Sequence, residues 1–90
     1  MRRACVLHEP QSGRRLTVET DRPGVQFYSG NFLDGTAQGP AGVRYTRNAG
    51  LCLETQAFPD APNHPTFPSI VLEPGDRYEA VTVWRFEVLP

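Results

Sequence analysis

Hydrophobic and polar residues alternate with a period of two along several short segments, a pattern that predicts β-strands. Nine prolines and eight glycines are spread through the chain and leave no room for a long helix. The sequence therefore predicts an all-β fold of five or six antiparallel strands with one apolar face. We expect these strands at residues 4–8, 14–20, 25–28, 51–56, 69–73 and 78–88, with Pro74-Gly75 at the centre of a type II turn before the last one.

Two of the predicted strands each have one polar face. In residues 51–56, Glu54 and Gln56 lie opposite a leucine-bearing face. Gln26 and Tyr28 lie on the polar face of the strand before it. A carboxylate and amides on strand faces are candidates for binding a small polar ligand.

Two segments next to these strands have other patterns, one typical of a long loop and one typical of a stiff extended segment. Residues 30–49 contain four glycines and little apolar periodicity, which predicts a long surface loop. After residue 56, proline recurs every third position, as on one edge of a polyproline II helix. The prolines of this repeat are Pro59, Pro62, Pro65 and Pro68.

Composition narrows the range of partners. A net charge of −1, a pI near 6.1 and nine dispersed arginines give no electrostatic reason to expect binding to nucleic acid or to an anionic membrane. No apolar run approaches the roughly 20 residues of a membrane-spanning helix, and no signal-peptide core follows the first residues, so we expect a cytoplasmic protein. Cys5 and Cys52 have no metal-ligand spacing, and we expect two small buried side chains, without a disulfide or a metal site.

Glu54 is the residue with the clearest chemical interest. One interpretation is an ordinary strand glutamate facing water, which the pattern alone favours. The other is a general base, because partial burial raises the pKa of a carboxyl group toward the working pH. Gln26 could orient a hydroxylated ligand, whereas His8 and His64 have no acidic or nucleophilic partner at a recognisable spacing.

With these residues in place, the sequence resembles the C-terminal part of the aldose 1-epimerases, or galactose mutarotases, over nearly its whole length. The motifs occur in order with similar spacing. They are Pro23-Gly24-Val25-Gln26-Phe27-Tyr28, Gly30-Asn31-Phe32-Leu33-Asp34-Gly35, Gly50-Leu51-Cys52-Leu53-Glu54-Thr55-Gln56, Phe58-Pro59-Asp60-Ala61-Pro62-Asn63-His64-Pro65, Phe67-Pro68-Ser69 and Leu72-Glu73-Pro74-Gly75.

The resemblance implies an antiparallel β-sandwich that forms the C-terminal part of a galactose-mutarotase-like supersandwich. It also implies interconversion of the α and β anomers of hexoses such as galactose and glucose, without cofactor or metal. In this chemistry a base removes the proton of the C1 hydroxyl, an acid protonates the ring oxygen, and the ring opens and recloses. Glu54 matches the catalytic base and Gln26 matches a substrate-binding side chain.

The family's acid is a histidine that precedes the matched motifs, and neither His8 nor His64 corresponds to it. We therefore expect residues 1–90 to form one partial domain, incomplete as an enzyme alone, that self-associates or pairs with an N-terminal complementing chain. The alternative is a non-catalytic carbohydrate-binding β-module. An epimerase for phosphorylated hexoses ranks lower, because Arg44, Arg47 and Arg77 are dispersed.

Overall fold

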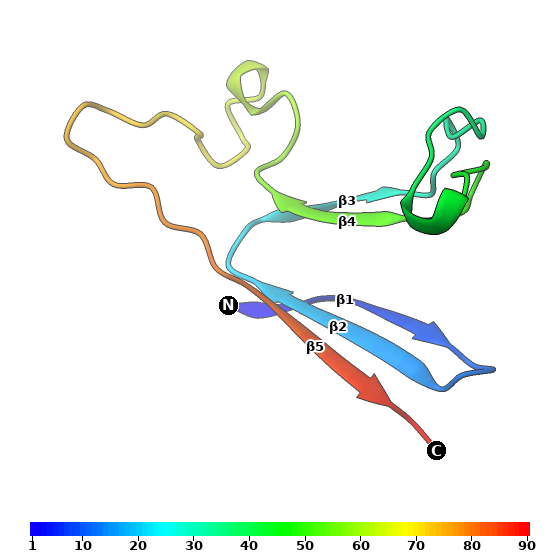
Figure 1. Ribbon diagram of the computed structural model, residues 1–90. Coiled ribbons are helices and arrows are strands. Elements are labelled where there is room, and N and C mark those ends of the chain that lie inside the picture. Colours follow the sequence, from blue (N-terminus) through cyan, green and yellow to red (C-terminus); the bar gives the residue numbers. More distant parts are fainter.

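The chain forms two antiparallel sheets joined by long irregular segments. The computed structural model describes residues 1–90 and contains, besides the strands, two 3-10 turns, η1 (Pro40–Gly42) and η2 (Ala61–Asn63). One sheet has the order β1-β2-β5 and the other pairs β3 with β4, in a layer above it in Figure 1. The all-β antiparallel prediction is confirmed. The strands are β1 (Arg2–Glu9), β2 (Arg14–Thr20), β3 (Gly24–Tyr28), β4 (Cys52–Gln56) and β5 (Thr82–Val88).

The three-stranded sheet has one apolar and one charged face. Leu16 lies opposite Phe86, and Val18 lies opposite Trp84, so large apolar side chains line one face of β2 and β5. Side chains of successive strand residues alternate between the two faces, so the residues next to these apolar ones lie on the other face. On that face, two ion pairs join β2 and β5. These ion pairs are Arg15 with Glu87 at 2.7 Å and Arg85 with Glu19 at 3.3 Å.

A tight turn joins β1 to β2. The Glu9 carboxylate accepts hydrogen bonds from the backbone N–H groups of Gln11 and Ser12 at 2.9 and 2.7 Å. Gly13 closes the turn at φ +76°, a backbone conformation that glycine adopts without steric cost. Its carbonyl accepts a 2.7 Å hydrogen bond from the N–H of Leu89, which ties the turn to the end of β5.

Residues 1–90 enclose only a small core. Val18 is fully buried and Thr20 is 1% exposed, whereas Trp84, Phe86 and Val88 are 52%, 72% and 70% exposed. The radius of gyration is 17.0 Å, compared with roughly 12 Å for a compact chain of this length. The apolar face of β1-β2-β5 is therefore largely uncovered by other residues of this chain.

The strand prediction for residues 69–73 is wrong, and the one for residues 78–88 is too long. Residues 64–81 form an exposed irregular segment, and the last strand begins only at Thr82. The apolar run at 69–73 finds no neighbouring strand to hydrogen-bond, and a strand needs such a partner. The predicted turn inside this segment is confirmed, with Gly75 at φ +90° and a 3.0 Å hydrogen bond from the N–H of Asp76 to the carbonyl of Glu73.

The polyproline II prediction for residues 59–68 is also wrong. Asp60 has a left-handed backbone at φ +62° and starts η2. Backbone hydrogen bonds of 3.0, 3.0 and 2.9 Å then close successive turns, which a polyproline II helix lacks. The segment coils back on itself, and neither it nor η1 provides a helix long enough to cross a membrane.

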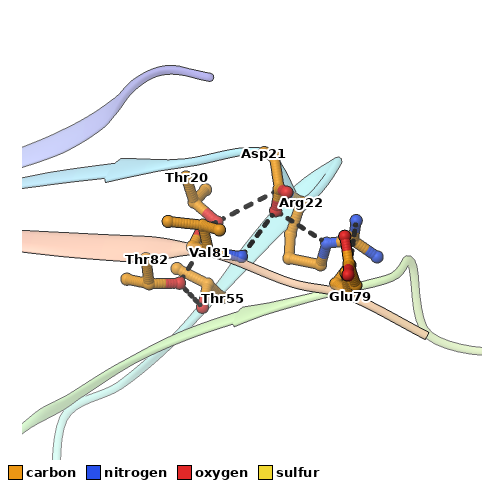
Figure 2. Close-up of polar contacts among 7 residues, drawn as sticks. All are labelled: Thr20, Asp21, Arg22, Thr55, Glu79, Val81 and Thr82. Atoms are coloured by element: carbon orange, nitrogen blue, oxygen red, sulfur yellow. Dashed lines mark hydrogen bonds and ion pairs between the residues drawn. The ribbon is translucent and has the colours of Figure 1, made fainter. Parts of the chain in front are cut away.

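A polar corner joins the end of β2 to the start of β5 (Figure 2). The Asp21 carboxylate accepts hydrogen bonds from the backbone N–H of Val81 at 3.1 Å and from Nε of Arg22 at 3.0 Å. These contacts, the Val81 bond first, lower the pKa of Asp21 below its ordinary value of 3.8. Arg22 also stacks its guanidinium over the ring of Tyr78, 5.4 Å from the ring centroid.

This corner predicts a loss of stability in acid. The lowered pKa means that the unfolded chain binds more protons than the folded chain as the pH falls below about 3.8, so the contribution of Asp21 is present above that pH and disappears below it. We expect Asp21→Asn to have a lower urea midpoint than wild type at pH 6, and this difference to shrink as the pH falls below about 3.8. A difference between the two proteins that is constant from pH 6 to pH 2 would contradict this assignment.

Candidate active site

The hairpin of β3 and β4 carries both predicted site residues. In its antiparallel register, Gln26 lies directly opposite Glu54. Directly opposed residues have side chains on the same face with Cβ atoms about 4.5–5.5 Å apart. The prediction that an acid and an amide share a polar face is confirmed, and the pairing makes them immediate neighbours.

The same register assigns the other residues of the hairpin to its two faces. Tyr28 lies opposite Cys52, and Gly24 lies opposite Gln56, so the predicted polar face extends along both strands. Cys52 is exposed and Cys5 is half-buried, and both are free thiols, so the prediction of two buried cysteines is wrong. The hairpin's apolar face carries Val25, Phe27, Leu53 and Thr55.

Glu54 is an exposed carboxylate that forms no hydrogen bond and no ion pair with another residue of the chain. This exposure agrees with the interpretation that the pattern alone favours, a strand glutamate facing water. The partial burial that belongs to the general-base interpretation does not occur, because no other segment of residues 1–90 covers this face. Gln26 is also exposed, and its amide makes only a 3.4 Å hydrogen bond to the carbonyl of Phe27. Both side chains are therefore free to bind a ligand. An uncompensated carboxylate beside a donor and acceptor amide suits a hydroxyl group, whose proton the carboxylate can accept.

Tyr28 anchors the long loop at one end of the polar face. Its hydroxyl accepts a 3.0 Å hydrogen bond from the N–H of Phe32, and the two rings stack at 6.2 Å. Asn48 secures the same loop, because its side-chain amide donates to the carbonyl of Ser29 at 2.6 Å and to Oδ1 of Asn31 at 2.7 Å. The predicted loop is confirmed and is fastened where it leaves β3, so the end of the polar face has a defined shape.

An aromatic cluster borders the other end of the hairpin. Phe58 packs against Gly24, where an added Cβ would lie 3.1 Å from the ring. Phe67 stacks on His64 at a centroid distance of 4.7 Å and packs against Phe58 in a tilted arrangement at 5.2 Å. His64 Nε2 lies 3.0 Å from Oδ2 of Asp60, four residues earlier in the chain, so the expectation that His64 has no acidic partner is wrong, and this histidine is a hydrogen-bonded loop residue.

Other features of the surface do not add to this site. No group of three His, Cys, Asp or Glu side chains is placed to hold a metal ion. A hollow of about 700 Å³ lies on the apolar face of the three-stranded sheet, and neither Glu54 nor Gln26 lines it. Because exposed Phe86 and Val88 border this hollow, we attribute it to the uncovered sheet face rather than to a binding pocket.

Sequence reasoning missed three threonines that connect the hairpin to the other sheet. Thr55 Oγ1 lies 2.8 Å from Thr82 Oγ1, which lies 3.2 Å from Thr20 Oγ1 (Figure 2). Threonine is common in strands, so nothing in the sequence distinguishes these three. Their contact depends on how the two sheets meet, which no local pattern specifies.

The geometry defines the class of protein: an all-β fold in which an acid and an amide are paired on the polar face of a hairpin. The aldose 1-epimerase family model matches residues 1–85, and the chain belongs to this family.

Individual relatives agree with this family. Galactose mutarotase of Bos taurus is 51% identical over 88 residues, which cover 97% of this chain and 26% of that protein. Galactose mutarotase of Homo sapiens is 52% identical over 82 residues, covering 91% of this chain and 24% of the human protein. Aldose 1-epimerase of Escherichia coli K12 is 44% identical over 75 residues, covering 80% of this chain and 21% of that protein. The chain thus spans about a quarter of the length of these relatives.

Proposed function

We propose that residues 1–90 supply the base-bearing part of an aldose 1-epimerase that interconverts the α and β anomers of galactose and related hexoses. The observation that carries this proposal is the direct pairing of Gln26 with Glu54 on the polar face of a hairpin, in a chain of this family. In the proposed reaction the Glu54 carboxylate takes the proton of the C1 hydroxyl. Gln26 holds the sugar by hydrogen bonds.

The reaction also needs an acid to protonate the ring oxygen as the C1–O bond breaks. Once the ring is open, rotation about the C1–C2 bond exposes the other face of the carbonyl. On reclosure the former ring oxygen adds to C1 and gives its proton back to the acid, while Glu54 returns its proton to the carbonyl oxygen. His64 is held by Asp60 and Phe67 and is not assigned this role. We propose that the acid comes from a further part of a complete epimerase domain. The same part would cover the apolar face of β1-β2-β5, where Trp84, Phe86 and Val88 are exposed.

A direct test joins this chain to the rest of the bovine galactose mutarotase, in place of the segment of that protein that it matches at 51% identity. We expect this joined protein to accelerate the equilibration of α-galactose, followed by polarimetry. The 90-residue chain alone should add little to the buffer rate, because an acid or base typically contributes about 10²–10⁴-fold.

A folded joined protein without activity would contradict the proposed function. If the 90-residue chain shows galactose-dependent NMR shifts at residues of the polar face while the joined protein stays inactive, the chain is a carbohydrate-binding module instead. Size-exclusion chromatography measures whether the 90-residue chain self-associates, which we expect because uncovered strand edges favour association.

A further inference from the structure

The threonines at the junction of the two sheets form a hydrogen-bonded chain (Figure 2). Thr20 is the last residue of β2, Thr82 is the first residue of β5 and lies opposite Thr20, and Thr55 belongs to β4. The Oγ1 atoms of Thr55 and Thr82 are 2.8 Å apart, and those of Thr82 and Thr20 are 3.2 Å apart. Both contacts are partly buried, and the 2.8 Å contact is the one hydrogen bond that crosses between the two sheets.

The number of hydroxyl protons determines which threonine donates in each of these hydrogen bonds. Each threonine hydroxyl has one proton to donate. Thr20 donates to the carbonyl of Val81 at 3.0 Å and accepts from the N–H of Arg22 at 3.1 Å. Thr82 must then donate to Thr20, and Thr55 must donate to Thr82. Every link has a donor and an acceptor, so the loss of one hydroxyl leaves a partly buried neighbour without its partner.

The series of hydrogen-bonded threonines ends next to the candidate base. Thr55 follows Glu54 in β4, and the side chains of successive strand residues point to opposite faces. Thr55 is therefore tied to the three-stranded sheet while Glu54 faces away, beside Gln26. Because β4 is a short strand with a single strand partner, β3, this bond restrains its tilt relative to β1-β2-β5.

We propose that Thr82 is a positioning residue for catalysis: its hydroxyl holds Thr55, and thereby holds the Glu54 carboxylate at a fixed place relative to the three-stranded sheet. This inference rests on the proposed function. A displacement of about 1 Å in a catalytic group can cost about 10²-fold in rate, so a bond that fixes the strand is expected to affect turnover.

The test uses Thr82→Val, which keeps the branched shape and removes the hydroxyl, in the joined protein. We expect kcat for mutarotation to fall about 10- to 100-fold, with KM changed by less than about threefold because Gln26 is untouched. Thr82→Ser keeps the hydroxyl and should restore kcat to within about threefold of wild type. Thr17→Val is the matched control, since Thr17 lies in β2 and forms no side-chain hydrogen bond.

The outcomes separate the two proposals. An inactive wild-type joined protein overturns the proposed function, and amide exchange of residues 52–56 then tests the restraint by itself, in the joined protein and in the 90-residue chain. We expect Thr82→Val, but not Thr82→Ser, to accelerate that exchange about tenfold or more. Unchanged exchange overturns the inference. So does unchanged kcat, or a kcat loss that parallels the melting temperature and is not restored by serine.

Discussion

Replacing Glu54 by glutamine is expected to reduce kcat for mutarotation about 10²–10⁴-fold in the joined protein. Glutamine has nearly the same shape as glutamate but cannot take a proton from the C1 hydroxyl. The loss should therefore lie mainly in kcat, with KM within a few-fold of wild type, because the sugar contacts of neighbouring Gln26 remain. Polarimetry of α-galactose over a range of concentrations separates the two constants.

Glu73→Gln is the control for this substitution. It makes the same chemical change at an exposed glutamate in the irregular segment between β4 and β5, away from the polar face. We expect wild-type kcat for this variant. If Glu54→Gln kept more than about a third of the wild-type kcat, Glu54 would not be the base, and the pairing with Gln26 would have to serve binding alone.

Replacing Gly30 by alanine is expected to destabilise the protein by about 2–3 kcal/mol. Gly30 has φ +73°, where a side chain is strained, and an added Cβ would lie 2.6 Å from the carbonyl oxygen of Gly50. The carbonyl of Gly30 also accepts the backbone hydrogen bonds of Leu33 and Asn48 at 3.2 and 3.0 Å. The change would therefore loosen the loop that is anchored by Tyr28 at the end of the polar face.

Gly50→Ala provides the matched control on the other side of the same contact. No atom lies within 4 Å of its added Cβ. We expect a neutral effect or a gain of up to about 1 kcal/mol, because alanine reduces the conformational entropy of the unfolded chain. Urea unfolding followed by circular dichroism measures both variants. Equal midpoints for the two would show that the close approach of Gly30 to Gly50 is unimportant for stability.

Local patterns were sufficient to locate the candidate site. Strand alternation placed Gln26 and Glu54 on polar faces, and the observed register confirms the arrangement. The turn at Gly75 followed from glycine and proline chemistry. The catalytic role of Glu54 and the sugar contact of Gln26 remain predictions.

Features that depend on distant partners could not be predicted in this way. The apolar run at residues 69–73 has the composition of a strand, but strand formation requires a hydrogen-bonding neighbour, and composition does not reveal whether one is present. The proline repeat was regular, yet the left-handed backbone of Asp60 and the turns after it prevent a polyproline II helix. The contact of Thr20, Thr55 and Thr82 arises only when the two sheets meet.

The pairing of β2 with β5 has a consequence for synthesis on the ribosome. Thr20 and Thr82 are neighbours in the sheet but lie 62 residues apart in the chain. At about 5–20 residues per second, the free edge of β2 must wait about 3–12 s after its own translation before β5 is made. During that time, the β1–β2 hairpin exposes an unpaired strand edge beside an apolar face. Chaperones and neighbouring chains compete to bind a surface of this kind.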